Sequence, residues 1–158
     1  MCRTVSAKSA EEQTERIRRW ADKGKAWAQG ILGQRYYDGK GVDQSYQQAR
    51  ELYELSASQG YARSQSKLGF MYAKGHGGDQ SYERAAEYYE AAARQGMAEA
   101  QFSLGVLYYN GDGVEQSTCN ETARAWWMKS AEQGVENAIK NLQILDEHEG
   151  RTTPSFFP

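Results

Sequence analysis

The stretch of sequence that decides the fold is residues 61–96, which read YARSQSKLGFMYAKGHGGDQSYERAAEYYEAAARQG. Two near-copies flank it, at residues 25–60 and 97–134. A Leu-Gly pair, a glycine-rich loop, a Gln-Ser pair and a final Gln-Gly recur in every copy, and the Leu-Gly pairs are spaced by 36 residues. Only the third copy is longer, by two residues near Cys119. Self-similarity at such a period is the sequence signature of a repeat protein.

Each copy is predicted to form two helices. In the first copy, the earlier helix spans about residues 26–38, with Leu32 and Tyr36 on one face. The later helix spans about residues 46–58 and carries small and aromatic residues at the spacing of a buried helical face. The three stripes are Ala49, Leu52, Tyr53, Ser56 and Ala57; Ala85, Tyr88, Tyr89, Ala92 and Ala93; and Ala123, Trp126, Trp127, Ser130 and Ala131. We therefore predict an all-α fold of antiparallel helix pairs.

The residues between the helices support these boundaries. Ser45 and Ser81 precede the later helices, where a hydroxyl would satisfy free backbone donors, and Gln116-Ser117 takes this place in the third copy. Solenoid ends need altered caps, so single capping helices are expected on both sides of the repeats. The predicted organisation is a tail at 1–9, a capping helix at 10–24, repeats at 25–60, 61–96 and 97–134, a capping helix at 135–148 and a tail at 149–158.

These residues resemble the Sel-1-like repeat family, which is related to the tetratricopeptide repeat. The tetratricopeptide pattern Trp-x-x-Leu-Gly-x-x-Tyr and Ala-x-x-x-Phe is matched by Gln29-x-x-Leu32-Gly33-x-x-Tyr36 and Ala49-x-x-x-Tyr53. The two-glycine loop and the 36-residue period are Sel-1-like departures from that pattern. The resemblance covers roughly residues 17–146 and implies a right-handed α-solenoid superhelix that serves as an adaptor for other proteins. It names no partner.

Composition and charge narrow the range of partners. The net charge is −2 in 158 residues, so the sequence lacks the excess of basic residues that is typical of nucleic-acid-binding proteins. No stretch approaches the roughly 20 apolar residues that cross a bilayer, and the first residues lack the apolar run of a secretory signal. The only cysteines, Cys2 in the expected tail and Cys119 in an expected loop, fit a reducing compartment. We expect a cytoplasmic protein with neither a nucleic-acid nor a membrane partner.

Motifs for catalysis or metal binding are weak. The glycine-rich loops at 39–41, 75–78 and 111–113 lack the preceding strand and the Lys-Ser/Thr of a phosphate loop. Residues 110–115 lack the ligands of a calcium loop. His76 and His148 stand at unrelated positions, so we expect solvated residues there and no zinc site. With no nucleophile and base that can be paired, we expect no enzyme, no cofactor, no metal and no small-molecule substrate.

A variable stripe on the earlier helix of each repeat is the candidate binding site. It lies away from Leu32 and Tyr36, and its residues differ between repeats although the frame does not. The matching positions line the concave groove in tetratricopeptide repeats, and large apolar residues on such a face suggest binding. The alternative is that they fill gaps between neighbouring helices. The candidates are Trp27, Gln34, Tyr37, Arg63, Phe70, Glu99, Phe102, Val106 and Tyr109.

The function that the sequence favours is therefore a non-catalytic scaffold or adaptor. An extended or helical peptide, or a segment of a protein, would lie in the groove. Two alternatives stay open. One is a hydrolase-type enzyme on a repeat scaffold, which a carboxylate with a raised pKa in a cleft would support. The other is a structural spacer in a larger protein, which a groove of small polar residues would support.

Overall fold

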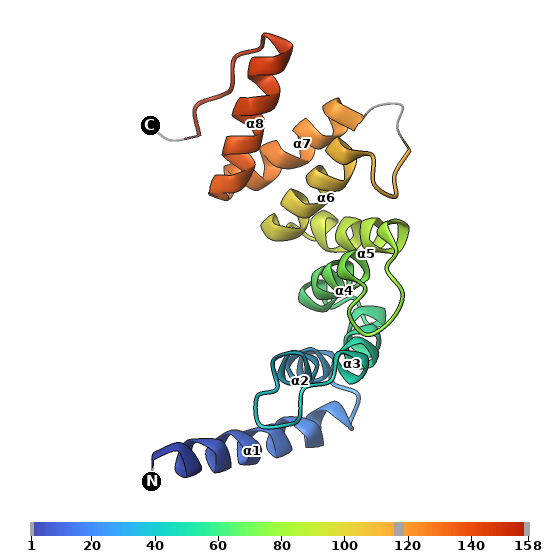
Figure 1. Cartoon of the computed structure of the whole chain (residues 1–158), viewed down its shortest axis with the longest axis vertical. Helices are drawn as coiled ribbons and strands as arrows, with labels where there is room; N and C mark the ends of the chain where they lie inside the picture. The colour runs from blue at the N-terminus through green and yellow to red at the C-terminus, as the bar shows by residue number, and fades with distance from the viewer. Residues whose placement is uncertain (1, 116–118, 157–158) are drawn as a thin grey trace. The chain divides into compact units, whose positions relative to one another are not determined.

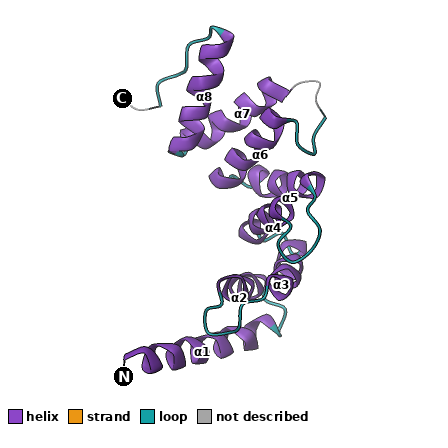
Figure 2. Cartoon of the chain, in the orientation of Figure 1, coloured by secondary structure: helices purple, strands orange, loops and turns teal. Residues whose placement is uncertain are grey.

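The computed structural model describes residues 2–115 and 119–156, with side chains for all of these except 2–7 and 119. Within these ranges the chain contains eight helices and no strand (Figure 1), and Figure 2 shows that short loops join them. In chain order the helices are α1 (Cys2–Ala21), α2 (Ala26–Asp38), α3 (Tyr46–Ser58), α4 (Ala62–Lys74), α5 (Tyr82–Arg94), α6 (Ala98–Asn110), α7 (Cys119–Glu132) and α8 (Glu136–Glu149). The prediction of an all-α fold is confirmed.

Capping groups stand at the helix ends. The Ser45 and Ser81 side chains accept hydrogen bonds from the backbone N–H groups of Gln48 and Arg84, which confirms both residues as N-caps of α3 and α5. The predicted counterpart, Gln116-Ser117, lies outside the described residues. A glycine in the left-handed conformation ends each of α2, α4 and α6, at Gly39, Gly75 and Gly111.

The chain forms two compact units, Met1–Gln80 and Ser81–Pro158. In the first, α1 packs against α2, α2 against α3, and α3 against α4. Tyr53 of α3 is buried, and its ring lies over Gly33 of α2, where an added Cβ would be 3.1 Å from the ring Cδ1. The Leu32-Gly33 pair thus marks the point where an aromatic ring of the following helix rests on the backbone.

The second unit repeats this arrangement with a larger ring. Trp127 of α7 is 2% exposed, and its indole Nε1 donates a hydrogen bond of 3.1 Å to the backbone carbonyl of Phe102 on α6. An added Cβ at Gly105 would lie 2.5 Å from the Trp127 Cδ1 and Nε1 atoms. The core cluster around this ring consists of Ala123, Trp127, Ala131, Ala138, Leu142 and Leu145.

The second glycine of each loop touches an earlier helix. A Cβ at Gly41 would lie 2.5 Å from the carbonyl oxygen of Ala10 on α1. The equivalent contacts join Gly77 to the backbone of Tyr46 at the start of α3, and Gly113 to the backbone of Tyr82 at the start of α5. Only a residue without a side chain fits in these places, so each loop rests on the helix that precedes its own helix pair.

The N-terminal end of the chain and the start of α7 differ from the sequence-based expectation. Residues 2–9, which we expected to form a tail, belong to α1, because no glycine or proline interrupts residues 2–21 and the helix continues to Cys2. Cys119 was expected in a loop, but it is the first residue of α7. After α8 the chain folds back, and Phe156 packs against the core cluster of the second unit.

An ion pair joins α7 to α8. Arg124 Nε donates a hydrogen bond of 2.7 Å to Asp146 Oδ1, and the Asp146 side chain is fully buried. This hydrogen bond, with a further one from Thr153, holds the pKa of Asp146 below its usual range. Thr153 belongs to the returning C-terminal segment, which is thereby tied to α8.

Candidate functional site

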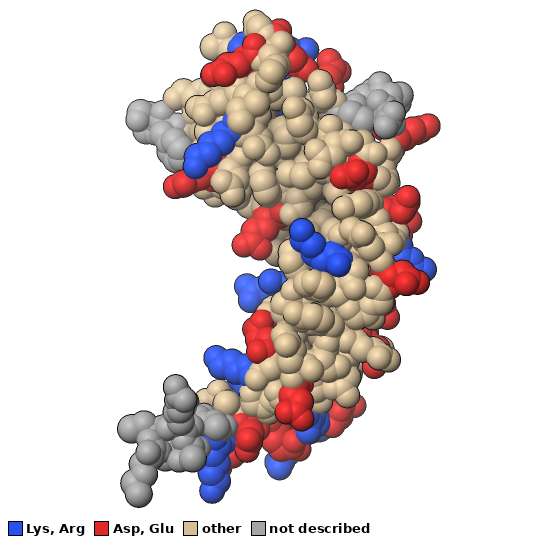
Figure 3. Space-filling view, viewed as in Figure 1, with Lys and Arg blue, Asp and Glu red and all other residues tan. Residues whose placement is uncertain are grey.

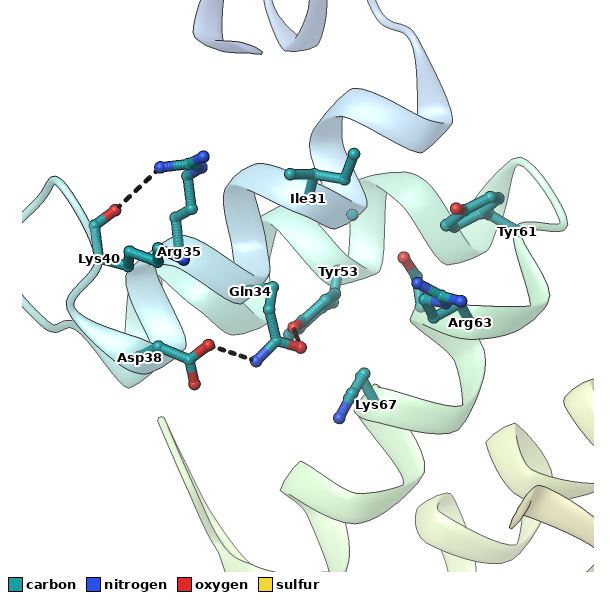
Figure 4. A pocket seen from close by; sticks show the side chains of 11 residues that line it. Ile31, Gln34, Arg35, Asp38, Lys40, Tyr53, Tyr61, Arg63 and Lys67 are labelled. Carbon is teal, nitrogen blue, oxygen red and sulfur yellow. Dashed lines mark hydrogen bonds between the residues drawn. The ribbon is translucent and has the colours of Figure 1, made fainter. Parts of the chain in front are cut away.

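A cavity of about 300 Å³ opens in the first unit between α2, α3 and α4 (Figure 4). It has the size of a small ligand pocket. Ile31, Gln34 and Asp38 reach it from α2, and Arg63 and Lys67 reach it from α4. The remaining lining residues are Gly30, Arg35, Lys40, Tyr53, Tyr61 and Ser64.

One wall of the cavity is a chain of hydrogen bonds. The Tyr53 hydroxyl donates to Gln34 Oε1 over 3.0 Å, and Gln34 Nε2 donates to Asp38 Oδ2 over 2.9 Å. Burial raises the pKa of Tyr53 far above its usual value, so the hydroxyl stays protonated and remains a donor. The predicted site residue Gln34 is therefore hydrogen-bonded to both Tyr53 and Asp38.

The cations around the cavity are of two kinds. Arg35 contacts α1: its Nη1 donates 2.9 Å to Thr14 Oγ1 and 3.3 Å to the carbonyl of Ala10. By contrast, the side chains of Lys40, Arg63 and Lys67 have neither a hydrogen bond nor an ion pair to any residue that the structure describes. Three cations are thus available to a ligand, whereas Arg35 stabilises the packing of α2 on α1.

Four aromatic rings form a cluster in the same unit. Tyr37 of α2 lies 5.0 Å from Tyr46 and 6.4 Å from Phe70, measured between ring centroids. His76 stacks on Tyr46 at 4.6 Å with an interplanar angle of 6°, and its Nδ1 is 2.9 Å from the Tyr37 hydroxyl. Burial, together with Tyr46 and Asp38, raises the pKa of Tyr37. We call Tyr37, Tyr46, Phe70 and His76 the aromatic cluster.

The aromatic cluster brings together two predicted site residues, Tyr37 and Phe70, with two that sequence reasoning missed. His76 was expected to be solvated, but it is half-buried between rings. Phe70 is 38% exposed and Tyr46 is 36% exposed, so the cluster has an open side. The aromatic residue that follows Ser45 and recurs after Ser81 was the available signal for Tyr46.

The other predicted residues lie apart from this cluster. Trp27 is 43% exposed, and its ring centroid is 6.3 Å from that of Trp20 on α1. In the second unit Glu99 and Tyr109 are exposed. Phe102 and Val106 are half-buried and pack against the core cluster around Trp127.

Several further features of the described residues bear on function. None of the helices in that part of the chain combines the length and apolarity that crossing a membrane requires. No group of three or more His, Cys, Asp or Glu residues there is placed to hold a metal ion. On the face that Figure 3 shows, acidic and basic side chains are interspersed, and neither sign forms a continuous block.

Comparison with known proteins places the chain in a family. The model of the Sel1 repeat matches three times, at residues 28–61, 62–97 and 98–135. A Sel1 repeat protein from Oxalobacter formigenes superposes with a TM-score of 0.83 at 28% identity, over 96% of this chain and 60% of that one.

A second solved structure is a protective antigen present in uropathogenic Escherichia coli strains, which displays an SLR fold. It superposes with a TM-score of 0.80 at 33% identity, over 87% of this chain and 29% of that one. This chain thus spans less than two thirds of the length of either protein. No curated protein matches it. Three matches of the repeat model cover more than half of the sequence, and the chain belongs to the Sel1 repeat family.

Proposed function

We propose that this chain is a non-catalytic interaction module that binds a peptide or protein segment on the surface shared by α2 and α4. Members of the Sel1 repeat family generally act as scaffolds for protein–protein interactions. We call this region the α2–α4 surface; it comprises the cavity and the neighbouring aromatic cluster. The stripe residues of α6, Glu99 and Tyr109 foremost, are candidates for the same role on their own unit.

The observation that carries the proposal is the aromatic cluster. Large aromatic side chains that are desolvated in an interface contribute 2 kcal/mol or more of binding energy each. Tyr37 and Phe70 do not belong to the repeated frame, yet they lie together with an open side. A protein has little reason to expose such a group unless something covers it.

The two alternatives find less support. A spacer would carry small polar residues on this surface, whereas Tyr37 and Phe70 are large and aromatic. A hydrolase would need a carboxylate with a raised pKa. The shifts found in the described residues go the other way: a hydrogen bond to its own backbone N–H lowers the pKa of Glu83, and Arg124 lowers that of Asp146.

The proposal is tested first by finding a partner. The full chain is immobilised, partners are captured from a matched lysate, and mass spectrometry identifies them. Binding of the identified partner is then measured for Tyr37→Ala and Phe70→Ala. Each variant should bind at least tenfold more weakly, which corresponds to about 1.4 kcal/mol.

Ile144→Ala is the matched control, because Ile144 on α8 is also apolar and is 52% exposed. It should bind as the wild type does. The helical circular dichroism signal of all three variants should be unchanged. Normal binding by both aromatic variants would refute the proposal, and unfolding of both would show that these rings belong to the core.

A further inference from the structure

The α2–α4 surface has a basic half and an aromatic half, and α4 contributes side chains to both. Arg63, Lys67 and Phe70 are spaced by four and three residues on α4, which places them on one face of the helix. Arg63 and Lys67 line the cavity, while Phe70 belongs to the aromatic cluster. A ligand that touches the cluster is therefore adjacent to two cations.

The charge at the basic half is unbalanced. The cavity is lined by four cationic side chains, those of Arg35, Lys40, Arg63 and Lys67, against the single carboxylate of Asp38. Asp38 accepts a hydrogen bond from Gln34, and Arg35 is held by α1. Arg63 and Lys67 thus present positive charge that the described part of the protein does not neutralise.

The spacing along α4 restricts the ligand. The midpoint between Arg63 and Lys67 is five positions before Phe70, which is about 7.5 Å at 1.5 Å per residue. Two residues of an extended peptide span about 6.7 Å, and side chains two positions apart point to the same side of a strand. An extended peptide with an acidic residue at one position and a large apolar residue two positions away would reach both halves.

We propose that the α2–α4 surface recognises an acidic peptide segment in which Asp or Glu stands two positions from Leu, Phe or Trp. The carboxylate lies between Arg63 and Lys67, and the apolar side chain covers Phe70 and Tyr37. Ile31 and Tyr61, which also line the cavity, contact the stem of the acidic side chain. This inference rests on the proposed function and adds the chemistry of the partner.

The test is a selection with the full chain. Random 12-residue peptides displayed on phage are selected on the wild type and on Arg63→Glu/Lys67→Glu. The wild type should enrich peptides with Asp or Glu two positions from Leu, Phe or Trp, and the variant should not. A synthetic copy of an enriched peptide, measured by fluorescence anisotropy, should bind the charge variant at least tenfold more weakly.

The control is Lys8→Glu/Lys140→Glu, which changes the net charge by the same amount at two exposed positions on α1 and α8, outside the α2–α4 surface. It should leave the affinity within about twofold of the wild type. Salt screens the attraction between exposed charges. Because the contact of a carboxylate with Arg63 and Lys67 is electrostatic, the affinity of the wild type for the peptide should also fall when the salt concentration rises from about 50 to about 300 mM.

The outcomes separate the two proposals. Enrichment of apolar peptides without acidic residues, with binding lost in Phe70→Ala but not in the charge variant, would overturn the inference and leave the proposed function standing. No enrichment, or equal binding by all variants, would overturn both.

A 12-residue oligo-thymidylate also carries negative charge and stacking rings. If it bound as tightly as the best peptide, the partner would be a nucleic acid and the inference would be wrong.

Discussion

The change Gly105→Ala tests whether the aromatic ring of the following helix sets the distance between the helices of a repeat. The new Cβ would be 2.5 Å from Cδ1 and Nε1 of Trp127, so the ring must move. It is 2% exposed in the core cluster and donates a hydrogen bond to the Phe102 carbonyl, which leaves it little room. Overpacking costs about 1–3 kcal/mol, and loss of the hydrogen bond costs about 1 kcal/mol.

Replacing a glycine within a helix by alanine also stabilises the helix, by about 1 kcal/mol. The net expectation is a loss of about 1–3 kcal/mol in the free energy of unfolding, measured by urea denaturation with circular dichroism at 222 nm. Gly33→Ala is the matched control. There the added Cβ would be 3.1 Å from the nearest ring atom of Tyr53, so the ring needs to move by only a few tenths of an ångström. It should stay within about 1 kcal/mol of the wild type. If Gly105→Ala were as stable as the wild type, α6 would not rest on Trp127.

Trp127→Ala should lower the free energy of unfolding by roughly 3–5 kcal/mol in the same assay; a loss below about 1 kcal/mol would place the ring at the surface. Gly113→Ala should cost more than about 1 kcal/mol, because its Cβ would collide with the Tyr82 backbone at a φ of +65°, and a neutral result would show that the loop can leave α5. Because Arg124 lowers the pKa of Asp146 in the folded state, the stability that this carboxylate contributes is complete above its unfolded pKa of about 3.9 and is lost as the pH falls through the folded pKa. The difference in melting temperature between the wild type and Asp146→Asn should thus be constant from pH 7 to about pH 5 and shrink below about pH 4; a difference independent of pH would contradict the ion pair.

The helices of the repeats could be predicted because local and periodic signals agree there. The expected helix at residues 26–38 is α2, and the one at 46–58 is α3. Capping serines, loop glycines and the apolar stripe each indicate the same boundaries. The start of α1 lacked such signals. It has no capping motif that marks its beginning, and its length follows from the absence of a residue that would end it.

The candidate site could be predicted only in part, because a helical stripe describes one helix at a time. Tyr37 and Phe70 were found from their stripes, whereas Tyr46 and His76 join them from a helix start and a loop. Their proximity depends on how the loop after α4 returns to α3, which no periodicity encodes. For Phe102 the stripe predicted a binding face, but the ring also packs against the core cluster.

The contact between the second loop glycine and an earlier helix divides each loop into two parts with different freedom to change length. From Gly111 to Gly113 the spacing equals that from Gly39 to Gly41, because the glycine must reach a fixed place on the backbone of α5. The two additional residues of the third repeat come later, after Gln116-Ser117, because the spacing from Gly113 to Gln116 equals that from Gly41 to Gln44. A grafted epitope or an affinity tag inserted at the place of these two residues is therefore expected to retain the contact between Gly113 and α5, whereas an insertion before Gly113 would move that glycine away from the α5 backbone.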